Sequence, residues 1–220
     1  MASRKSKKIR RGLFVTLDGP EGCGKSTQAK VLARWLRRKG FSVVFTRDPG
    51  GSPIAEEIRG LLLDPRHQEL SPLAETLLYE TSRASLVEQV ILPALRKGEV
   101  VICDRFSDAT RVYQGIAGGV CECLIAEIDE EVCEGLKPDI TFFLDVSSRR
   151  GTLRLRRRGR LDRMEGKPLS FHEAVRRGYR KIAREDPKRI RFIPDLPLAA
   201  VTERIQKEMT RVLQRHFGST

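Results

Sequence analysis

The segment LFVTLDGPEGCGKST occupies residues 13–27 and joins an apolar run to a glycine-rich turn. The run, Leu13–Asp18, is short and uninterrupted, as in a strand that is buried on both faces of a sheet. The turn at residues 19–26 has the pattern G-x4-G-K-S, in which glycines let backbone N–H groups converge on phosphate oxygens. Apolar residues at helical spacing follow from Ser26 to Arg38 and end at Gly40. A glycine-rich turn without a ligand is the alternative, but the order strand, turn, helix favours a nucleotide phosphate site.

The remainder of the chain alternates between strand and helix patterns. Further strands are predicted at Ser42–Thr46, Val100–Cys103, Ile140–Asp145 and Arg191–Ile193. Helices are predicted from Ser52-Pro53 to about Leu63, from Ser71-Pro72 to about Lys97, near 107–117, 121–135 and 147–158, and at Phe171–Arg184 and Leu198–Phe217. This alternation predicts an α/β fold with three layers, a five-stranded parallel sheet covered by helices on both faces.

The net charge of +13 is concentrated in two segments. Residues 1–12 contain six basic and no acidic residues, and residues 149–163 contain eight arginines beside Asp162, so the rest of the chain is neutral overall. We interpret residues 1–11 as a disordered basic arm, residues 12–220 as a single domain, and about 149–165 as a basic lid. The charge therefore does not indicate a specific nucleic-acid partner.

Hydropathy and cysteine content point to a cytoplasmic protein. The chain has no run of the roughly 20 apolar residues that a membrane span needs, and its start has no apolar signal-peptide core. Its five cysteines are odd in number, and Cys23 and Cys103 fall in segments of the predicted site, which favours reduced thiols. Cys121, Cys123 and Cys133 lack the spacing of a zinc site.

Asp104-Arg105 ends the third predicted strand. Ligands of an open parallel sheet bind beyond the carboxyl ends of its strands, so this pair should face the glycine-rich turn. We expect Ser26 and Asp104 to hold Mg²⁺, and the guanidinium of Arg105 to bridge phosphates. A structural ion pair is the alternative for an isolated Asp-Arg, but a neighbouring phosphate site favours the functional role.

Several segments together resemble the bacterial thymidylate kinases in order and spacing. They are Gly19–Thr27, Thr46–Gly51 (TRDPGG), Arg83 within LLYETSR, Asp104–Phe106, Tyr113–Gly115 (YQG) and Leu161–Glu165 (LDRME). The resemblance covers about residues 12–217. It implies a P-loop NTPase fold, Mg²⁺-dependent transfer of the γ-phosphate of ATP to dTMP to give dTDP, and a homodimer.

The resemblance also implies the substrate contacts. ATP would be bound by Gly19, Pro20, Glu21, Gly22, Cys23, Gly24, Lys25, Ser26 and Thr27. The dTMP contacts would be Arg47 on the phosphate, Arg83 and stacked Tyr79 on thymine, Tyr113 against deoxyribose, and Arg105, Thr110 and Gln114 nearby. A solvated Arg47, a surface Arg83 on an amphipathic helix and a core aromatic at Tyr79 are the alternatives. Phe106 and Ala109 depart from the residues common in the family.

The catalytic residues implied are Lys25, Arg105, Glu21 and lid arginines, named as Arg156, Arg157 and Arg160. One subtype of the family has an arginine directly after the acidic residue of the loop, and here Gly22 takes that place. The other subtype supplies its arginine from the lid, and Arg154–Arg160 is dense in arginine. A solvated basic helix is the alternative interpretation of the lid.

Two rival functions remain open at this point. A kinase for another nucleotide could use the same sheet, and a substrate panel would distinguish it. A P-loop ATPase regulated by nucleic acid would fit the net charge, but it leaves TRDPGG and YQG without a role.

Overall fold

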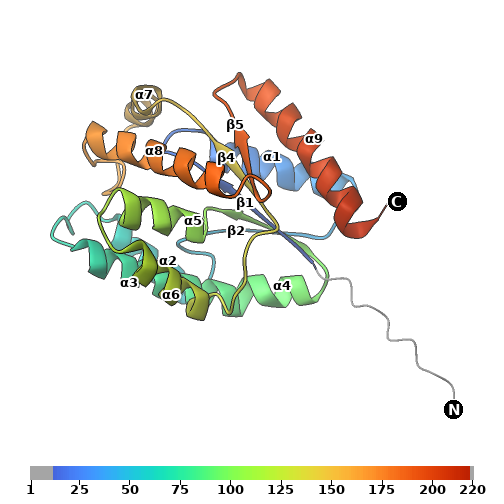
Figure 1. The fold of residues 1–220 in the computed structure, drawn as a ribbon, viewed down its shortest axis with the longest axis horizontal. Helices are drawn as coiled ribbons and strands as arrows, with labels where there is room; N and C mark the ends of the chain where they lie inside the picture. Colours follow the sequence, from blue (N-terminus) through green and yellow to red (C-terminus); the bar gives the residue numbers. More distant parts are fainter. Residues whose placement is uncertain (1–11, 219–220) are drawn as a thin grey trace, which may run out of the picture.

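The computed structural model describes residues 12–218, so the predicted basic arm at 1–11 lies outside the described residues. The strands are β1 (Leu13–Asp18), β2 (Val43–Arg47), β3 (Val100–Asp104), β4 (Ile140–Leu144) and β5 (Ile190–Ile193). They form one parallel sheet in the order β2-β3-β1-β4-β5 (Figure 1), so all five predicted strands are confirmed to within a residue. The central strand is β1, and each of its residues is buried. The glycine-rich turn therefore starts from the most protected position in the sheet.

Alternate residues of β1 face two different layers of helices. Leu13, Val15 and Leu17 pack in one core with α1 (Lys25–Arg38) and α9 (Leu198–Phe217), which lie side by side (Figure 1). Phe14 belongs to the opposite layer. That layer has one core under the continuous helical run of α3, η1 and α4, at residues 72–96, and a second core, containing Phe143, under the helices that flank the site. The three-layer α/β architecture is confirmed.

The predicted helices are all present. Besides α1 and α9, the helices are α2 (Pro53–Leu63), α3 (Pro72–Leu86), α4 (Leu92–Arg96), α5 (Ser107–Thr110), α6 (Glu122–Val132), α7 (Ser148–Arg158) and α8 (Leu169–Glu185), with π-helical turns η1 (Val87–Ile91) and η2 (Arg111–Ile116). The turn η1 precedes Pro93, which lacks the N–H that a regular helix requires there. The turn η2 carries Tyr113 and Gln114. None of the helices within residues 12–218 has the length and apolarity to cross a bilayer.

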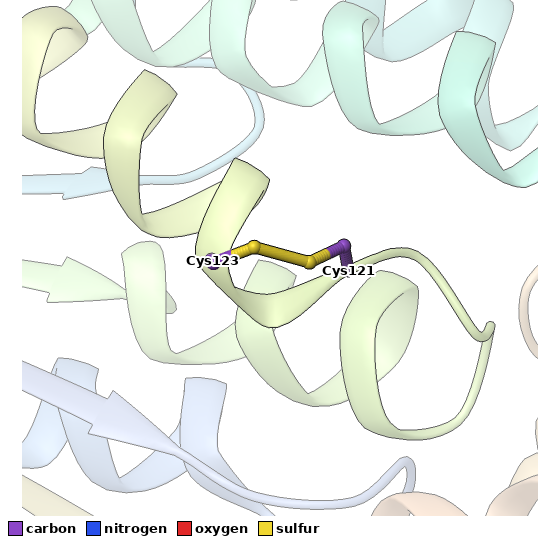
Figure 2. The surroundings of a disulfide bond; sticks show 2 residues. All are labelled: Cys121 and Cys123. Atoms are coloured by element: carbon purple, nitrogen blue, oxygen red, sulfur yellow. A yellow bond between two sulfur atoms is a disulfide. The ribbon is translucent and has the colours of Figure 1, made fainter.

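One expectation about the cysteines is wrong. Cys121 and Cys123 form a disulfide at the start of α6 (Figure 2), whereas we expected every thiol to be reduced. Cys121 is the residue that precedes α6 and Cys123 lies in its first turn, and their Cα atoms are 5.4 Å apart, within disulfide range. Cys23, Cys103 and Cys133 are free. Spacing alone did not reveal the pair, because both cysteines fall in the predicted helix 121–135, and side chains two residues apart in a helix do not face each other.

Candidate active site

A cavity of about 360 Å³ lies where the carboxyl ends of β1, β2 and β3 meet α7. On one side is the glycine-rich turn, in which Gly19, Gly22 and Gly24 have φ values of 146°, 70° and 93°. Such values favour glycine, and Gly24 is also the residue that precedes α1. The turn therefore has the backbone form of a phosphate-binding loop at the N-terminus of a helix.

Side chains of this loop lie on the cavity. Lys25 is buried, and its Nζ lies 3.5 Å from Oε2 of Glu21, while Ser26 and Thr27 are exposed at the cavity surface. The sequence predicted each of these positions. Asp104 lies on the same cavity, and no ion pair or hydrogen bond engages its carboxylate within residues 12–218.

The two predicted metal ligands fit a magnesium ion chemically. Ser26 and Asp104 both offer oxygen to the cavity, and Mg²⁺ is commonly held by one or two protein oxygens together with substrate phosphates and water. Within the described part of the chain, no group of three or more His, Cys, Asp or Glu side chains could form an all-protein metal site.

Arg105 is the centre of a polar network at the floor of the cavity. Its φ of 72° is unusual for a residue with a side chain, and this conformation directs the guanidinium back toward the loop. Nη2 donates to Oε1 of Glu21 at 2.6 Å and to the Tyr113 hydroxyl at 2.9 Å. Nη1 donates to Oδ1 of Asp18 at 3.2 Å and to the Tyr179 hydroxyl at 2.9 Å. The sequence predicted Arg105, Glu21 and Tyr113 but not Asp18 or Tyr179.

The two carboxylates of this network have opposite pKa shifts. Burial raises the pKa of Glu21, but the charges of Arg105 and Lys25 outweigh burial and lower the pKa to about 2. Burial dominates at Asp18 and raises its pKa to about 6, although Arg105 and the hydrogen bond from Tyr179 act against it. Glu21 is therefore ionised at neutral pH, and its single charge offsets part of the positive charge of Arg105 and Lys25.

Arg83 belongs to a second network, which we call the Arg83 cluster: Arg83, Asp48, Glu80, Asp129 and Thr110. Arg83 is 1% exposed and donates to Asp48 at 2.7 Å, Glu80 at 2.7 Å, Asp129 at 3.1 Å and Thr110 at 2.5 Å. Burial raises the pKa of Asp48, and it raises that of Glu80 to about 7. Each guanidinium nitrogen is thus bonded, yet Arg83 still lines the cavity, so one N–H of Nη2 can face a ligand. The surface-helix alternative for Arg83 is excluded.

Gln114 is fixed by a relay that sequence reasoning missed. Its Nε2 donates to Oε1 of Glu75 at 2.6 Å, and Arg163 approaches the other oxygen of Glu75 at 2.5 Å. Arg163 is fully buried and also donates to the carbonyl of Leu62 at 2.7 Å. The LDRME segment therefore connects to the cavity wall through a buried ion pair.

Arg47 and Tyr79 lie on the cavity as expected, and Arg59 joins them. Arg47 is half-exposed and pairs with Glu56 at 2.7 Å, while Glu56 also accepts from the N–H of Gly51 at 2.7 Å. Arg59 donates to the carbonyl of Pro49 at 2.9 Å. Arg59 follows Glu56 by three residues in α2, so the two side chains lie on the same face of the helix, near Arg47. The predicted helix from Ser52-Pro53 therefore contained the signal that could have identified Arg59.

The segment predicted as a lid, about 149–165, begins in helix α7, and its arginines divide into two sets. Arg154 donates to the carbonyl of Gly22 at 3.0 Å, and Arg158 donates to Glu165 at 2.5 Å; both line the cavity. The three arginines named from the sequence, Arg156, Arg157 and Arg160, are exposed and do not line it. The two cavity arginines are four residues apart and so share one face of the helix.

The lid meets the loop through two glycines. A Cβ at Gly22 would lie 2.5 Å from the carbonyl oxygen of Gly151, and a Cβ at Gly151 would collide with the carbonyl oxygen of Glu21. The absence of a side chain at residue 22 is therefore what lets the backbone of α7 rest on the loop.

The chain is similar to known proteins over most of its length. The family described as thymidylate kinase matches residues 17–205. A thymidylate kinase of Pseudomonas savastanoi pv. phaseolicola is 45% identical over 208 residues, which cover 94% of this chain and 99% of that protein. One from Exiguobacterium sp. is 44% identical over 81% of this chain and 84% of its own. The crystal structure of thymidylate kinase from Ehrlichia chaffeensis superposes with a TM-score of 0.76 at 32% identity, covering 91% of this chain and 99% of that one.

Proposed function

The chain belongs to the thymidylate kinase family, with the P-loop NTPase fold, and transfers a phosphoryl group from ATP to dTMP to give dTDP; we propose here how its residues divide that reaction. The observation that carries the proposal is the convergence on one cavity of the P-loop, Arg47, the Arg83 cluster, Arg105 and α7. Phosphoryl transfer depends on positioning and charge neutralisation more than on covalent chemistry.

The donor nucleotide occupies the loop from Gly19 to Thr27 in this proposal. Backbone N–H groups and Lys25 hold its phosphates, and Ser26 and Asp104 hold the Mg²⁺ that accompanies them. That ion, when bound, would neutralise charge on the phosphates. Arg105 leaves Glu21 in part to bridge donor and acceptor phosphates, and the ionised Glu21 offsets part of the positive charge of the site before they bind.

The acceptor lies toward α2 and α3. Arg47, assisted by Arg59, binds the dTMP phosphate, whose own anionic oxygen attacks in line, so that no general base is needed. Arg83 and Gln114 contact the thymine ring that stacks on Tyr79, and Tyr113 packs against deoxyribose. Tyr113 is supported in this by its hydroxyl, which donates to Glu21 at 3.0 Å.

Arg154 and Arg158 are our preferred lid cations, in place of the Arg156, Arg157 and Arg160 named from the sequence. They line the cavity, and their present partners are a carbonyl and one carboxylate. Charge that builds on the moving phosphoryl group needs such a source, because Gly22 has no side chain to provide it.

The decisive assay is formation of the diphosphate from ATP and dTMP beside dUMP, dCMP, dGMP and AMP. We expect dTMP to be the best acceptor, with a moderate preference over dUMP, since one methyl group in an apolar pocket is worth about 1–3 kcal/mol. Equal or faster turnover of AMP or dGMP would contradict the assigned base contacts.

We also propose that two copies pair through α2 and α3. Ile54 and Leu61 of α2 and Leu73 and Leu77 of α3 are each nearly half exposed, and the two helices pack against each other. Changing Leu73 and Leu77 to Lys should convert a dimer into monomers in sedimentation analysis. Leu198→Lys, at a more exposed leucine on α9, is the control that should leave the dimer intact.

A further inference from the structure

A second cavity, of about 320 Å³, lies between the start of α7 and helix α8. The two helices are neighbours (Figure 1), and no residue of this cavity also lines the active-site cavity. The lining residues are Ser147, Ser148 and Arg149 from the start of α7, and Glu173, Arg176, Arg177 and Arg180 from α8.

Positive charge exceeds negative charge around this cavity. Arg176 and Arg180 are bound by Asp145, at 2.8 Å and 2.6 Å. Arg149 and Arg177 have no ion pair or hydrogen bond within residues 12–218. With Glu173 and Asp145 counted against the four arginines, two positive charges remain unbalanced. An anion is the ligand that such a surface attracts.

The serine hydroxyl at residue 148 of the cavity wall also lacks a partner. Ser148 is 7% exposed, and its hydroxyl has no hydrogen-bond partner in the described structure. The hydroxyl itself is closed to solvent, and a buried hydroxyl left unpaired is costly, so a rotation that brings it to a ligand oxygen at the cavity wall would be favourable. It lies at the N-terminus of α7, a helix of 11 residues. The side chain of Ser147 caps the N–H of Arg150, so the N–H groups of Ser148 and Arg149, together with the helix dipole, favour negative charge there.

We propose that this cavity binds a phosphate-bearing small molecule, separately from the substrates. The Ser148 hydroxyl and the first N–H groups of α7 donate to phosphate oxygens, and Arg149 and Arg177 neutralise the charge. The same helix carries Arg154 and Arg158 one to three turns later, so an anion here would hold the base of the lid. Neither the cavity nor its charge depends on the roles assigned to active-site residues.

Inorganic pyrophosphate is the probe for this site. The protein is first saturated with ADP and dTMP, which do not react with each other and which fill the phosphate-binding loop. Calorimetric titration at constant ionic strength should then reveal one pyrophosphate site. Arg149→Gln with Arg177→Gln should weaken binding at least ~10-fold, because two charge-assisted hydrogen bonds are lost. Neither arginine has a protein partner, so this variant should fold normally.

Two further variants decide between a site and general attraction. Arg184→Gln with Lys188→Gln removes the same charge from exposed positions at the far end of α8 and beyond it, outside the cavity, and should leave pyrophosphate binding unchanged. Ser148→Ala changes no charge and should still weaken binding. The proposal is overturned if the ADP–dTMP complex does not bind pyrophosphate, if both double variants weaken binding equally, or if Ser148→Ala has no effect.

Discussion

The Arg83 cluster and the lid arginines carry positive charge on the same cavity in opposite ways. Arg83 is almost fully buried and has three carboxylates and a hydroxyl as fixed partners. Arg154 and Arg158 are exposed, and each has one hydrogen-bond partner across the cavity rim. A guanidinium that pairs with several carboxylates in the interior cannot move without leaving them unpaired. An exposed arginine can change partner at little cost in free energy. The first arrangement suits a fixed contact with a base, and the second suits a cation that engages only while the phosphoryl group moves.

The comparison predicts its largest effect at Arg83. Arg83→Ala should lower the free energy of unfolding by about 3–5 kcal/mol, because Asp48, Glu80 and Asp129 lose their shared counter-ion. Urea denaturation measures this loss. Arg47→Ala is the matched control: its pair with Glu56 is half-exposed, so the loss should stay below about 1 kcal/mol.

Kinetics separate the binding role of Arg83 from its structural role. Arg83→Lys keeps a charge among the acids but loses the planar donor fork, so KM for dTMP should rise more than KM for ATP. Equal losses of stability in Arg83→Ala and Arg47→Ala would remove the distinction between a buried arginine with several partners and an exposed arginine with one. A rise confined to the KM for ATP would place Arg83 away from the acceptor base.

The lid should give the next largest effect. Replacing Arg154, Arg156, Arg157, Arg158 and Arg160 together by Gln should lower kcat at least ~100-fold, with little change in KM for dTMP. The structure sharpens this: Arg154→Gln with Arg158→Gln should account for most of the loss. The triple change at Arg156, Arg157 and Arg160 is the control and should leave kcat within about threefold. Near-normal kcat in the folded quintuple variant would identify the lid as a solvated basic helix.

The fold and the P-loop could be predicted from the sequence more fully than the Arg83 cluster or the lid. The fold and the P-loop follow from local patterns, apolar runs, glycine positions and serine-proline starts, and these were predicted to within a few residues. The partners of Arg83 were not, because Asp48, Glu80 and Asp129 come from three segments whose meeting depends on packing. Glu75 and Arg163 were missed for the same reason.

At the lid, the density of arginine was visible but its orientation was not. Helical spacing from Gly151 could have identified the cavity face, since Arg154 and Arg158 follow it at three and seven residues. That inference needs the knowledge that Gly151 contacts the loop, which only the three-dimensional contact with Gly22 reveals. The sequence therefore predicted the features that local patterns determine and missed those that depend on long-range contacts.

The contact between lid and loop provides a smaller test. Gly151→Ala places a methyl group against the carbonyl oxygen of Glu21, so α7 must shift away from the loop. A displacement of about 1 Å at a reacting centre can cost ~100-fold in rate, and we expect kcat to fall by roughly 10- to 100-fold. Gly60→Ala on α2 is the control, because nothing lies within 4 Å of the added Cβ, and it should leave kcat unchanged. An unaffected Gly151→Ala would mean that the lid does not need to rest on the loop.

The smallest effect should come from Asp18, where the network around Arg105 is only partly satisfied. Oδ1 accepts from Gly19, Arg105 and Tyr179, but Oδ2 is buried with no partner. Burial raises the pKa of Asp18 from 3.8 to about 6 in the folded protein. The folded state therefore binds more protons than the unfolded state between about pH 4 and 6, and the contribution of this group to stability falls as pH rises through that window and is constant above it.

Asp18→Asn should remove a slope of up to about 1 kcal/mol per pH unit from the unfolding free energy measured in urea. Asp145→Asn is the control, because Arg176 and Arg180 overcome burial and lower its pKa, so its titration lies below the window. If the wild type and Asp18→Asn show the same slope between pH 4.5 and 6, Asp18 is ionised in the folded protein, and its charge is fully compensated by Arg105.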